Sequence, residues 1–134
     1  MEVIGLNPVD VERLLEQSEV LSIHLPVTDK TRWFYSADVL DRLRSDCVFI
    51  NTACGRIVDE QALKERLMDG CIIAAAIDAF EVESPEDDEL LNLPNFMAMP
   101  HIGAGSLEAR WAMGASAIEG LTGDFIPKPG VFPF

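Results

Sequence analysis

The chain has 134 residues, of which 49% are hydrophobic, and this composition is typical of a globular domain with a buried core. Its formal net charge of -13 argues against binding to nucleic acid or to anionic membrane surfaces. No apolar run approaches the roughly 20 residues of a membrane span, no signal-peptide pattern opens the chain, and three cysteines without a CxxC pair indicate a reducing, cytoplasmic compartment.

The first half of the sequence alternates between helical and strand patterns. In "NPVDVERLLEQ", Asn7 is placed as an N-cap and Pro8 as a first helical residue, and apolar residues then recur at helical spacing. The short apolar run "EVLSIH" predicts a buried strand, and "LPVTDKT" predicts a polar loop. Ser36 is expected to cap a helix over "ADVLDRL", and "CVFIN" predicts a second buried strand.

The second half continues the same alternation. Asp59 is expected to cap a helix over "EQALKERLMDG", which Gly70 ends. The runs "CIIAAAI" and "FMAMP" predict a third and a fourth strand. The acidic residues 86–89 between them are interpreted as a solvated loop. Ser106 is expected to cap a long helix that extends to about Leu121.

Apolar strands separated by helices predict an α/β fold with a mostly parallel sheet covered on both faces, in three layers. Ligands of such sheets bind beyond the carboxyl ends of the strands. Here those ends carry His24, residues 51–55, residues 78–83 and residues 101–105. The fold alone therefore predicts that both histidines, a cysteine and several acids lie along one edge of the sheet.

His101 and Glu83 are the candidates for acid-base chemistry at this edge. A carboxylate beside a histidine fixes its tautomer and raises its pKa, as proton transfer near neutral pH requires. Such a pair suits proton transfer coupled to hydride transfer. On spacing alone the alternative stays open that a histidine after Pro100 has a purely structural role.

Four motifs occur in one order along the chain: H-x-P-x-T in "HLPVT", N-T-A-x-G in "NTACG", D-x-F-x-x-E in "DAFEVE", and "PHIG". From about Val11 to Leu121 the sequence resembles the NAD-dependent D-2-hydroxyacid dehydrogenases. The resemblance implies hydride transfer between NAD(H), with NADP not excluded, and a small 2-hydroxy or 2-keto acid. It further implies that residues 1–125 form the second half of a Rossmann-like NAD-binding domain, followed by a Pro-rich tail over 126–134.

The resemblance also assigns roles to individual residues. His101 matches the catalytic acid-base histidine, Glu83 matches the glutamate that pairs with it, and Asp78 matches the aspartate at the nicotinamide end of the cofactor. The other positions that it implies for cofactor binding come from three turns. They are His24, Pro26, Asn51, Thr52, Ala53, Cys54, Gly103 and Ala104.

Cys54 departs from the family pattern, which has an arginine there that binds the substrate carboxylate and polarises its carbonyl. A thiol cannot form the bidentate contact of an arginine. Arg56 could in principle reach across to replace it, although the family's residue at that position does not face the substrate. A nucleophilic Cys54 would need an activating base, and a metal site would need ligand spacing that the sequence lacks, so Cys54 is interpreted as a small neutral residue.

The family's pyrophosphate-binding loop is not found in this sequence. "GAGSLE" resembles the beginning of G-x-G-x-x-G, but it lacks the third glycine. We therefore expect a partial domain that lacks efficient activity by itself. We also expect it to form a homo-oligomer, because half a sheet exposes a strand edge and an apolar surface. The alternative is a non-catalytic remnant or pseudoenzyme that acts as an assembly or binding module.

Overall fold

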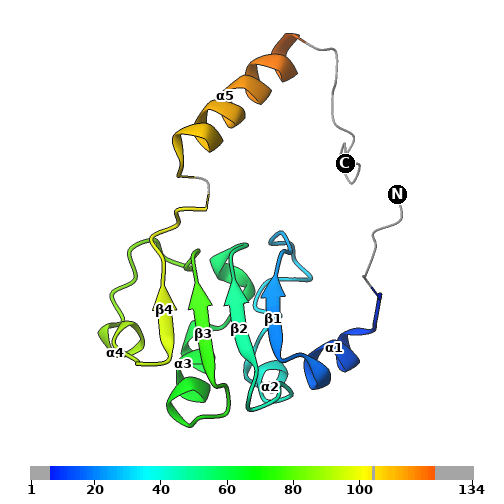
Figure 1. Cartoon of the computed structure of the whole chain (residues 1–134), viewed down its shortest axis with the longest axis vertical. Coiled ribbons are helices and arrows are strands. Elements are labelled where there is room, and N and C mark those ends of the chain that lie inside the picture. Colours follow the sequence, from blue (N-terminus) through cyan, green and yellow to red (C-terminus); the bar gives the residue numbers. More distant parts are fainter. Residues whose placement is uncertain (1–6, 104, 123–134) are drawn as a thin grey trace. The chain divides into compact units, whose positions relative to one another are not determined.

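The computed structural model describes residues 7–103 and 105–122, and it divides the chain into two compact units with the boundary after His101. The second unit contains the helix α5 (Leu107–Thr122). The first unit contains all the other elements, which alternate along the chain (Figure 1). They are α1 (Val11–Gln17), β1 (Val20–Ile23), α2 (Ala37–Leu40), β2 (Val48–Asn51), the 3-10 helix η1 (Gly55–Ile57), α3 (Glu60–Met68), β3 (Ala74–Ile77), α4 (Asp88–Leu91) and β4 (Phe96–Ala98).

The four strands form one parallel sheet in the order β1-β2-β3-β4. The register places Ile23 beside Asn51, and Asn51 beside Ile77, so the strands end level with one another. All four arrows in Figure 1 accordingly point toward the same edge of the sheet. The predicted α/β fold with a parallel sheet is confirmed, and the segments that follow the strands emerge side by side.

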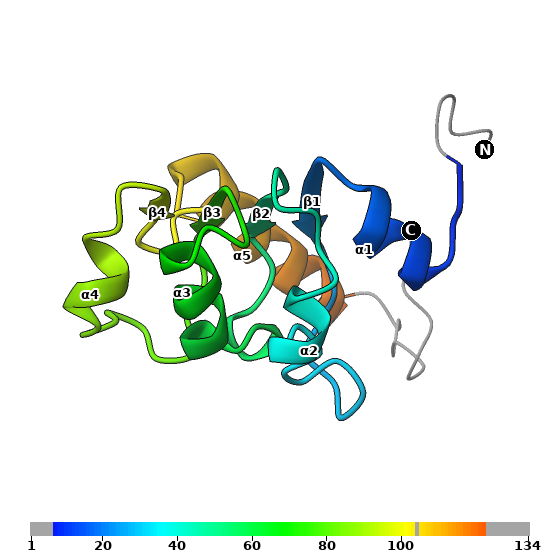
Figure 2. The same ribbon diagram turned by 90° about the horizontal axis from the view of Figure 1, so that it is seen from below.

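One face of the sheet forms the core of the first unit. Alternate strand residues such as Leu21, Phe49 and Ile77 are at most 4% exposed and belong to a single apolar cluster. Helices α2 and α3 lie on this side of the sheet, as Figure 2 shows. Leu40 and Leu63 from these helices are buried in the same cluster, so burial of apolar surface holds the helices against the strands.

The opposite face of the sheet is more open. Its residues are half-buried or exposed, with Val20 at 59% and Met97 at 60% exposure. Across β2 and β3 this face presents Val48, Ile50, Ala74 and Ala76. Residues 7–101 therefore supply the parallel sheet and a helical layer on one of its faces.

The predicted caps of α3 and α5 are confirmed, but the first helix begins later than expected and α2 ends earlier, at Leu40. The Asp59 carboxylate accepts a hydrogen bond from the Ala62 amide, and Gly70 follows α3 with a φ of +71°. The predicted cap at Asn7 is wrong. Asp10 caps α1 instead, because its carboxylate accepts from the amide of Arg13, the third helical residue.

The acidic segment after β3 is more than a solvated loop, contrary to the sequence interpretation. Asp87 caps α4 by accepting from the Leu90 amide, and its carboxylate lies 2.8 Å from Nζ of Lys64. Glu89 lies 3.2 Å from the same ammonium group. The segment thus ties α4 to α3. None of the helices in the described ranges is long and apolar enough to cross a bilayer, and the tail over 126–134 lies outside those ranges.

Candidate functional site

The turn after β2 is shaped by the side chain of Asn51, which is fully buried. Its Oδ1 accepts a hydrogen bond from the Ala53 amide at 3.1 Å, and its Nδ2 donates to the Cys54 carbonyl at 2.9 Å. A buried amide needs such partners, and here they are the backbone of the turn itself. Asn51 therefore fixes the path of residues 51–54 at the end of the strand.

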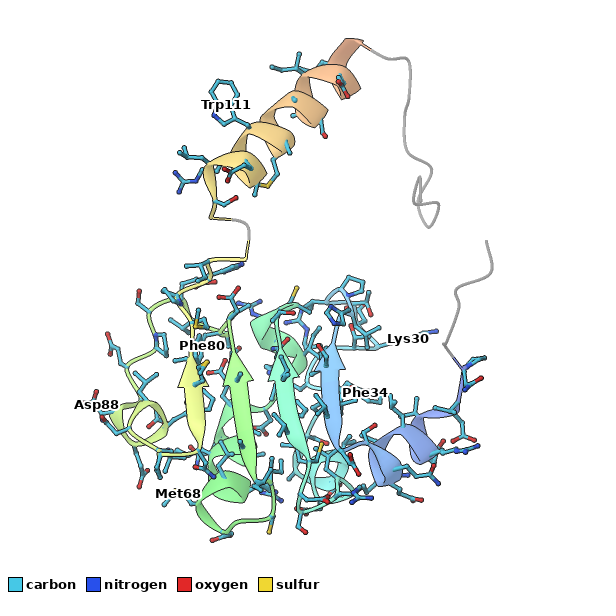
Figure 3. The ribbon with its side chains drawn as sticks, viewed as in Figure 1. Lys30, Phe34, Met68, Phe80, Asp88 and Trp111 are labelled. Atoms are coloured by element: carbon cyan, nitrogen blue, oxygen red, sulfur yellow. The ribbon has the colours of Figure 1, made fainter. Side chains whose placement is uncertain are left out.

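Gly55 allows this turn to lie against the segment that follows β3. A Cβ atom at Gly55 would overlap the backbone carbonyl group of Phe80 and the amide nitrogen of Glu81. Only glycine permits so close an approach of two backbones. Phe80 itself lies near the upper ends of β3 and β4 in Figure 3. The glycine thus brings Cys54 and residues 79–83 to one place.

His101 and Glu83 lie in contact, as the sequence predicts for the candidate acid-base pair. His101 Nδ1 lies 2.6 Å from Glu83 Oε1, and a carboxylate can only accept, so Nδ1 carries the proton. The hydrogen bond to Glu83, followed by the charge of Glu83, raises the pKa of His101 above its ordinary value. The charge of Asp78 acts in the same direction. Both side chains are at least half exposed, which leaves Nε2 of the imidazole free to exchange protons with a ligand or solvent.

Backbone strain accumulates around this pair. Among the described residues other than glycine, those with positive φ are Trp33 at +49°, Ser84 at +62° and His101 at +53°. Such conformations cost of order 1 to 3 kcal/mol each and occur preferentially at functional sites. His101 itself is therefore strained, and the strained residue Ser84 directly follows Glu83.

A cavity of about 360 Å³ joins these parts of the site. Val27, Ala53, Ala79 and Phe80 contribute apolar surface to it. The polar and charged side chains that line the cavity are Arg32, Cys54, Arg56, Glu81, Glu83 and His101. The first unit therefore combines an apolar wall, an acid-base pair and two guanidinium groups in one cavity.

Several of the other predicted cofactor residues lie elsewhere. His24 Nε2 lies 2.8 Å from Ser22 Oγ, and His24 lines a separate cavity beside α1 and β1. The Pro26 carbonyl accepts a hydrogen bond from the Thr31 hydroxyl. Asp78 is buried at the end of β3, directly before the cavity residue Ala79. Thr52 is exposed on the turn, Gly103 belongs to the second unit, and Ala104 lies outside the described residues.

Arg32 is a cavity residue that the sequence did not predict. Its loop is hydrogen-bonded to the segment that follows β2: the Trp33 amide donates to the Arg56 carbonyl at 2.8 Å, and the Tyr35 amide donates to the Ile57 carbonyl at 3.1 Å. These long-range backbone contacts bring the segments of Arg32 and Arg56 together, and both residues line the same cavity. No local pattern around Arg32 indicates this pairing, because it depends on the tertiary fold.

Comparison with known proteins identifies the family. The profile described as "D-isomer specific 2-hydroxyacid dehydrogenase, NAD binding domain" matches residues 1–103. The chain belongs to the D-isomer-specific 2-hydroxyacid dehydrogenases. This confirms the resemblance inferred from the four motifs, and it identifies the described sheet as part of the family's NAD-binding domain.

Relatives of known activity match most of the chain. A hydroxypyruvate reductase of Thermotoga maritima is 38% identical over 114 residues, which make up 83% of this chain and 37% of the relative. A glyoxylate/hydroxypyruvate reductase B of Enterobacter agglomerans is 42% identical over 113 residues, which make up 84% of this chain and 35% of the relative. The chain thus spans little more than a third of the length of these relatives.

A solved structure supports both the family fold and a nicotinamide cofactor. The NADPH-dependent glyoxylate/hydroxypyruvate reductase of Sinorhizobium meliloti, in complex with NADP and malonate, superposes with a TM-score of 0.82 at 32% identity. The match covers 91% of this chain and 39% of that one. Together with the family profile, it supports a nicotinamide dinucleotide as the cofactor class of this domain.

Proposed function

We propose that the chain is part of an NAD(P)-dependent oxidoreductase that interconverts a small 2-keto acid and the corresponding 2-hydroxy acid. The observation that carries this proposal is the His101–Glu83 pair at 2.6 Å in a cavity at the carboxyl ends of the strands. In reduction, protonated His101 donates a proton from Nε2 to the substrate carbonyl oxygen, and Glu83 holds the ring. In oxidation, neutral His101 accepts that proton.

The cavity residues fit one end of the cofactor. The apolar wall of Val27, Ala53 and Ala79 suits the nicotinamide ring, and the buried Asp78 lies at the adjoining strand end. When bound, the nicotinamide supplies or accepts the hydride. The pyrophosphate lacks a comparable site, because the sequence contains no G-x-G-x-x-G turn. We therefore propose that this chain by itself binds the dinucleotide weakly, with NAD as the expected form and NADP not excluded.

Cys54 limits the rate that this site can reach. The thiol lines the cavity at the position where the family pattern has its substrate-binding arginine. Removing one partner of a buried charge pair costs about 2 to 5 kcal/mol. That cost corresponds to roughly a 30-fold to several-thousand-fold loss of rate. We therefore propose that the chain alone lacks efficient catalysis.

The alternative is a non-catalytic binding or assembly module. The substitution at Cys54 favours it, whereas the retained His101–Glu83 pair favours an oxidoreductase. The oxidoreductase and the binding module are distinguished by measuring, through the loss of NADH absorbance, how fast glyoxylate or hydroxypyruvate oxidises NADH. A slow reaction that His101→Ala abolishes would support the oxidoreductase. If the wild type reacts no faster than the His101→Ala variant, the binding module is supported.

Cofactor binding is tested by amide NMR titration with NADH and with NADPH. We expect shifts of the amide resonances in residues 51–56, 78–83 and 101, because these segments form the cavity wall or adjoin it. Stronger shifts with one of the two dinucleotides would decide between NAD and NADP. The absence of shifts in these segments at millimolar ligand would contradict the proposed cofactor site.

Two further proposals concern the oligomeric state and the cellular location of the chain. We propose a homo-oligomer, since the open face of the sheet exposes Val20 and Met97. We also propose a cytoplasmic location, which is supported by Cys47, Cys54 and Cys71 being free thiols.

A further inference from the structure

Two arginines meet at the cavity from segments that are distant in sequence. Arg32 lies in the loop after β1 and Arg56 in η1 after β2, and both side chains line the cavity together with Cys54 and His101. The hydrogen bond from the Trp33 amide to the Arg56 carbonyl, at 2.8 Å, joins the two segments. The isolated bridge between Tyr35 and Val58 continues this connection. Backbone geometry therefore sets the positions of both arginines.

The guanidinium groups of Arg32 and Arg56 form only long contacts with neighbouring side chains. Arg56 Nε lies 3.9 Å from Glu81 Oε1, which is a long ion pair between side chains that are 54% and 40% exposed. Within the described part of the chain, Arg32 forms no ion pair, and its guanidinium carbon lies 5.8 Å from the centre of the Trp33 ring. An arginine offers several N–H donors in a planar fork. Donors on both residues thus remain available to a ligand.

The charges of the cavity favour a small anion when His101 is protonated. Glu83 is paired with His101, and Glu81 is the carboxylate nearest to Arg56. Arg32 then adds a positive charge that no carboxylate in the cavity wall balances. This local balance is unusual in a chain with a net charge of -13. It is suited to a carboxylate ligand, which an arginine fork binds in a bidentate way.

We propose that Arg56, with Arg32 beside it, binds the carboxylate of a small 2-keto or 2-hydroxy acid in place of the arginine that Cys54 has replaced. The short thiol leaves room for the carboxylate to reach Arg56 through the shared cavity. This inference rests on the proposed function and names the substrate-binding groups of that same site. Because Arg56 is displaced from position 54, it supports binding of the acid, but it polarises the substrate carbonyl less than an arginine at position 54 would.

The inference is tested by titrating the chain with oxalate, a non-reactive dicarboxylate, and measuring its dissociation constant by calorimetry or amide NMR. We expect Arg56→Ala to weaken binding by about 10- to 100-fold, as the loss of charge-assisted hydrogen bonds implies. Arg32→Ala should weaken binding less. Glu81→Gln should strengthen it, because the variant removes the carboxylate that competes for Arg56.

Matched variants separate a specific site from general charge effects. Arg42→Ala removes the same charge from an arginine that pairs with Glu16 and does not line the cavity, and its oxalate affinity should equal that of the wild type. Arg56→Lys keeps the charge but loses the fork, so an intermediate affinity is expected. Circular dichroism of each variant checks that it is folded. Equal losses in Arg42→Ala and Arg56→Ala would overturn the proposal.

Cys54→Arg distinguishes a failure of this inference from a failure of the proposed function. If the wild type does not bind oxalate but Cys54→Arg does, the arginine pair does not replace the missing group, although the proposed site remains. If neither protein binds oxalate, this inference is wrong. In that case the NADH titration decides whether the cofactor site, and with it the proposed function, also fails. Binding by the wild type that Arg56→Ala reduces supports the inference.

Discussion

At the scale of single residues, Glu83 raises the pKa of His101. Its carboxylate accepts the Nδ1 proton at 2.6 Å and raises the pKa of the imidazole, so His101 stays protonated to higher pH than a free histidine. The folded pKa lies above the unfolded one. The pair therefore stabilises the fold fully below the unfolded pKa, and this contribution is lost as pH rises through the folded pKa.

Glu83→Gln should lower the pKa of His101, because a neutral amide removes both the strong hydrogen bond and the negative charge. Any reduction of a keto acid would then lose its rate at a lower pH than in the wild type. The pKa is measured by NMR titration of the imidazole protons. The chain has two histidines, so the signals of His101 are identified by their loss in His101→Ala. An unchanged pKa of His101 would show that Glu83 does not set it.

At the scale of elements, the close contact at Gly55 joins the turn after β2 to the segment after β3. The backbone at Phe80 and Glu81 leaves no space for a Cβ at this position. The same segment is held from the other side, since the Glu81 amide donates to Glu60 Oε1 on α3 at 2.6 Å. The cavity wall is therefore an outcome of contacts between elements rather than of one loop.

Gly55→Ala should destabilise the fold by about 3 kcal/mol or more, at the upper end of the effects of overpacking, because the backbone of Phe80 must move. Denaturant unfolding measures the change. Gly114→Ala in α5 is the control, since a Cβ there meets nothing within 4 Å. It should be neutral or stabilise the helix by up to about 1 kcal/mol. Equal unfolding midpoints for the Gly55→Ala variant and the wild type would contradict the close packing.

The apolar runs and caps of the sequence were sufficient to predict the strands and most of the helices. They were also sufficient to place His101 and Glu83 near one another, because the ends of parallel strands share an edge. They could not predict Arg32, whose position follows from the hydrogen bond between Trp33 and Arg56.

At the scale of the whole molecule, the open face of the sheet in the first unit is an apolar surface, and it adjoins β1, which pairs with only one strand among the described residues. Val48 and Ile50 on the central strand β2 are only half-buried, and Met97 on β4 is 60% exposed. Surfaces of this kind mark interaction sites. The net charge of -13 opposes contact between copies at low ionic strength, and salt screens that repulsion.

Self-association should therefore be detected by size-exclusion chromatography with light scattering at micromolar concentration, and it should increase with salt. Met97→Lys on the open face should shift the chain toward the monomer, because a charge there would have to be desolvated in the interface. Met68→Lys is the matched control: Met68 is 53% exposed at the end of α3, away from the sheet face. A wild-type chain that remains monomeric at all salt concentrations would contradict the prediction.

The loop that carries Arg32 also carries a natural optical reporter. Trp33 is 49% exposed and follows a cavity residue directly, whereas Trp111, which projects from α5 in Figure 3, is 77% exposed in the second unit. These are the two tryptophans of the chain. In a Trp111→Phe background, the intrinsic emission of Trp33 should therefore report occupancy of the cavity by an anion without any added label.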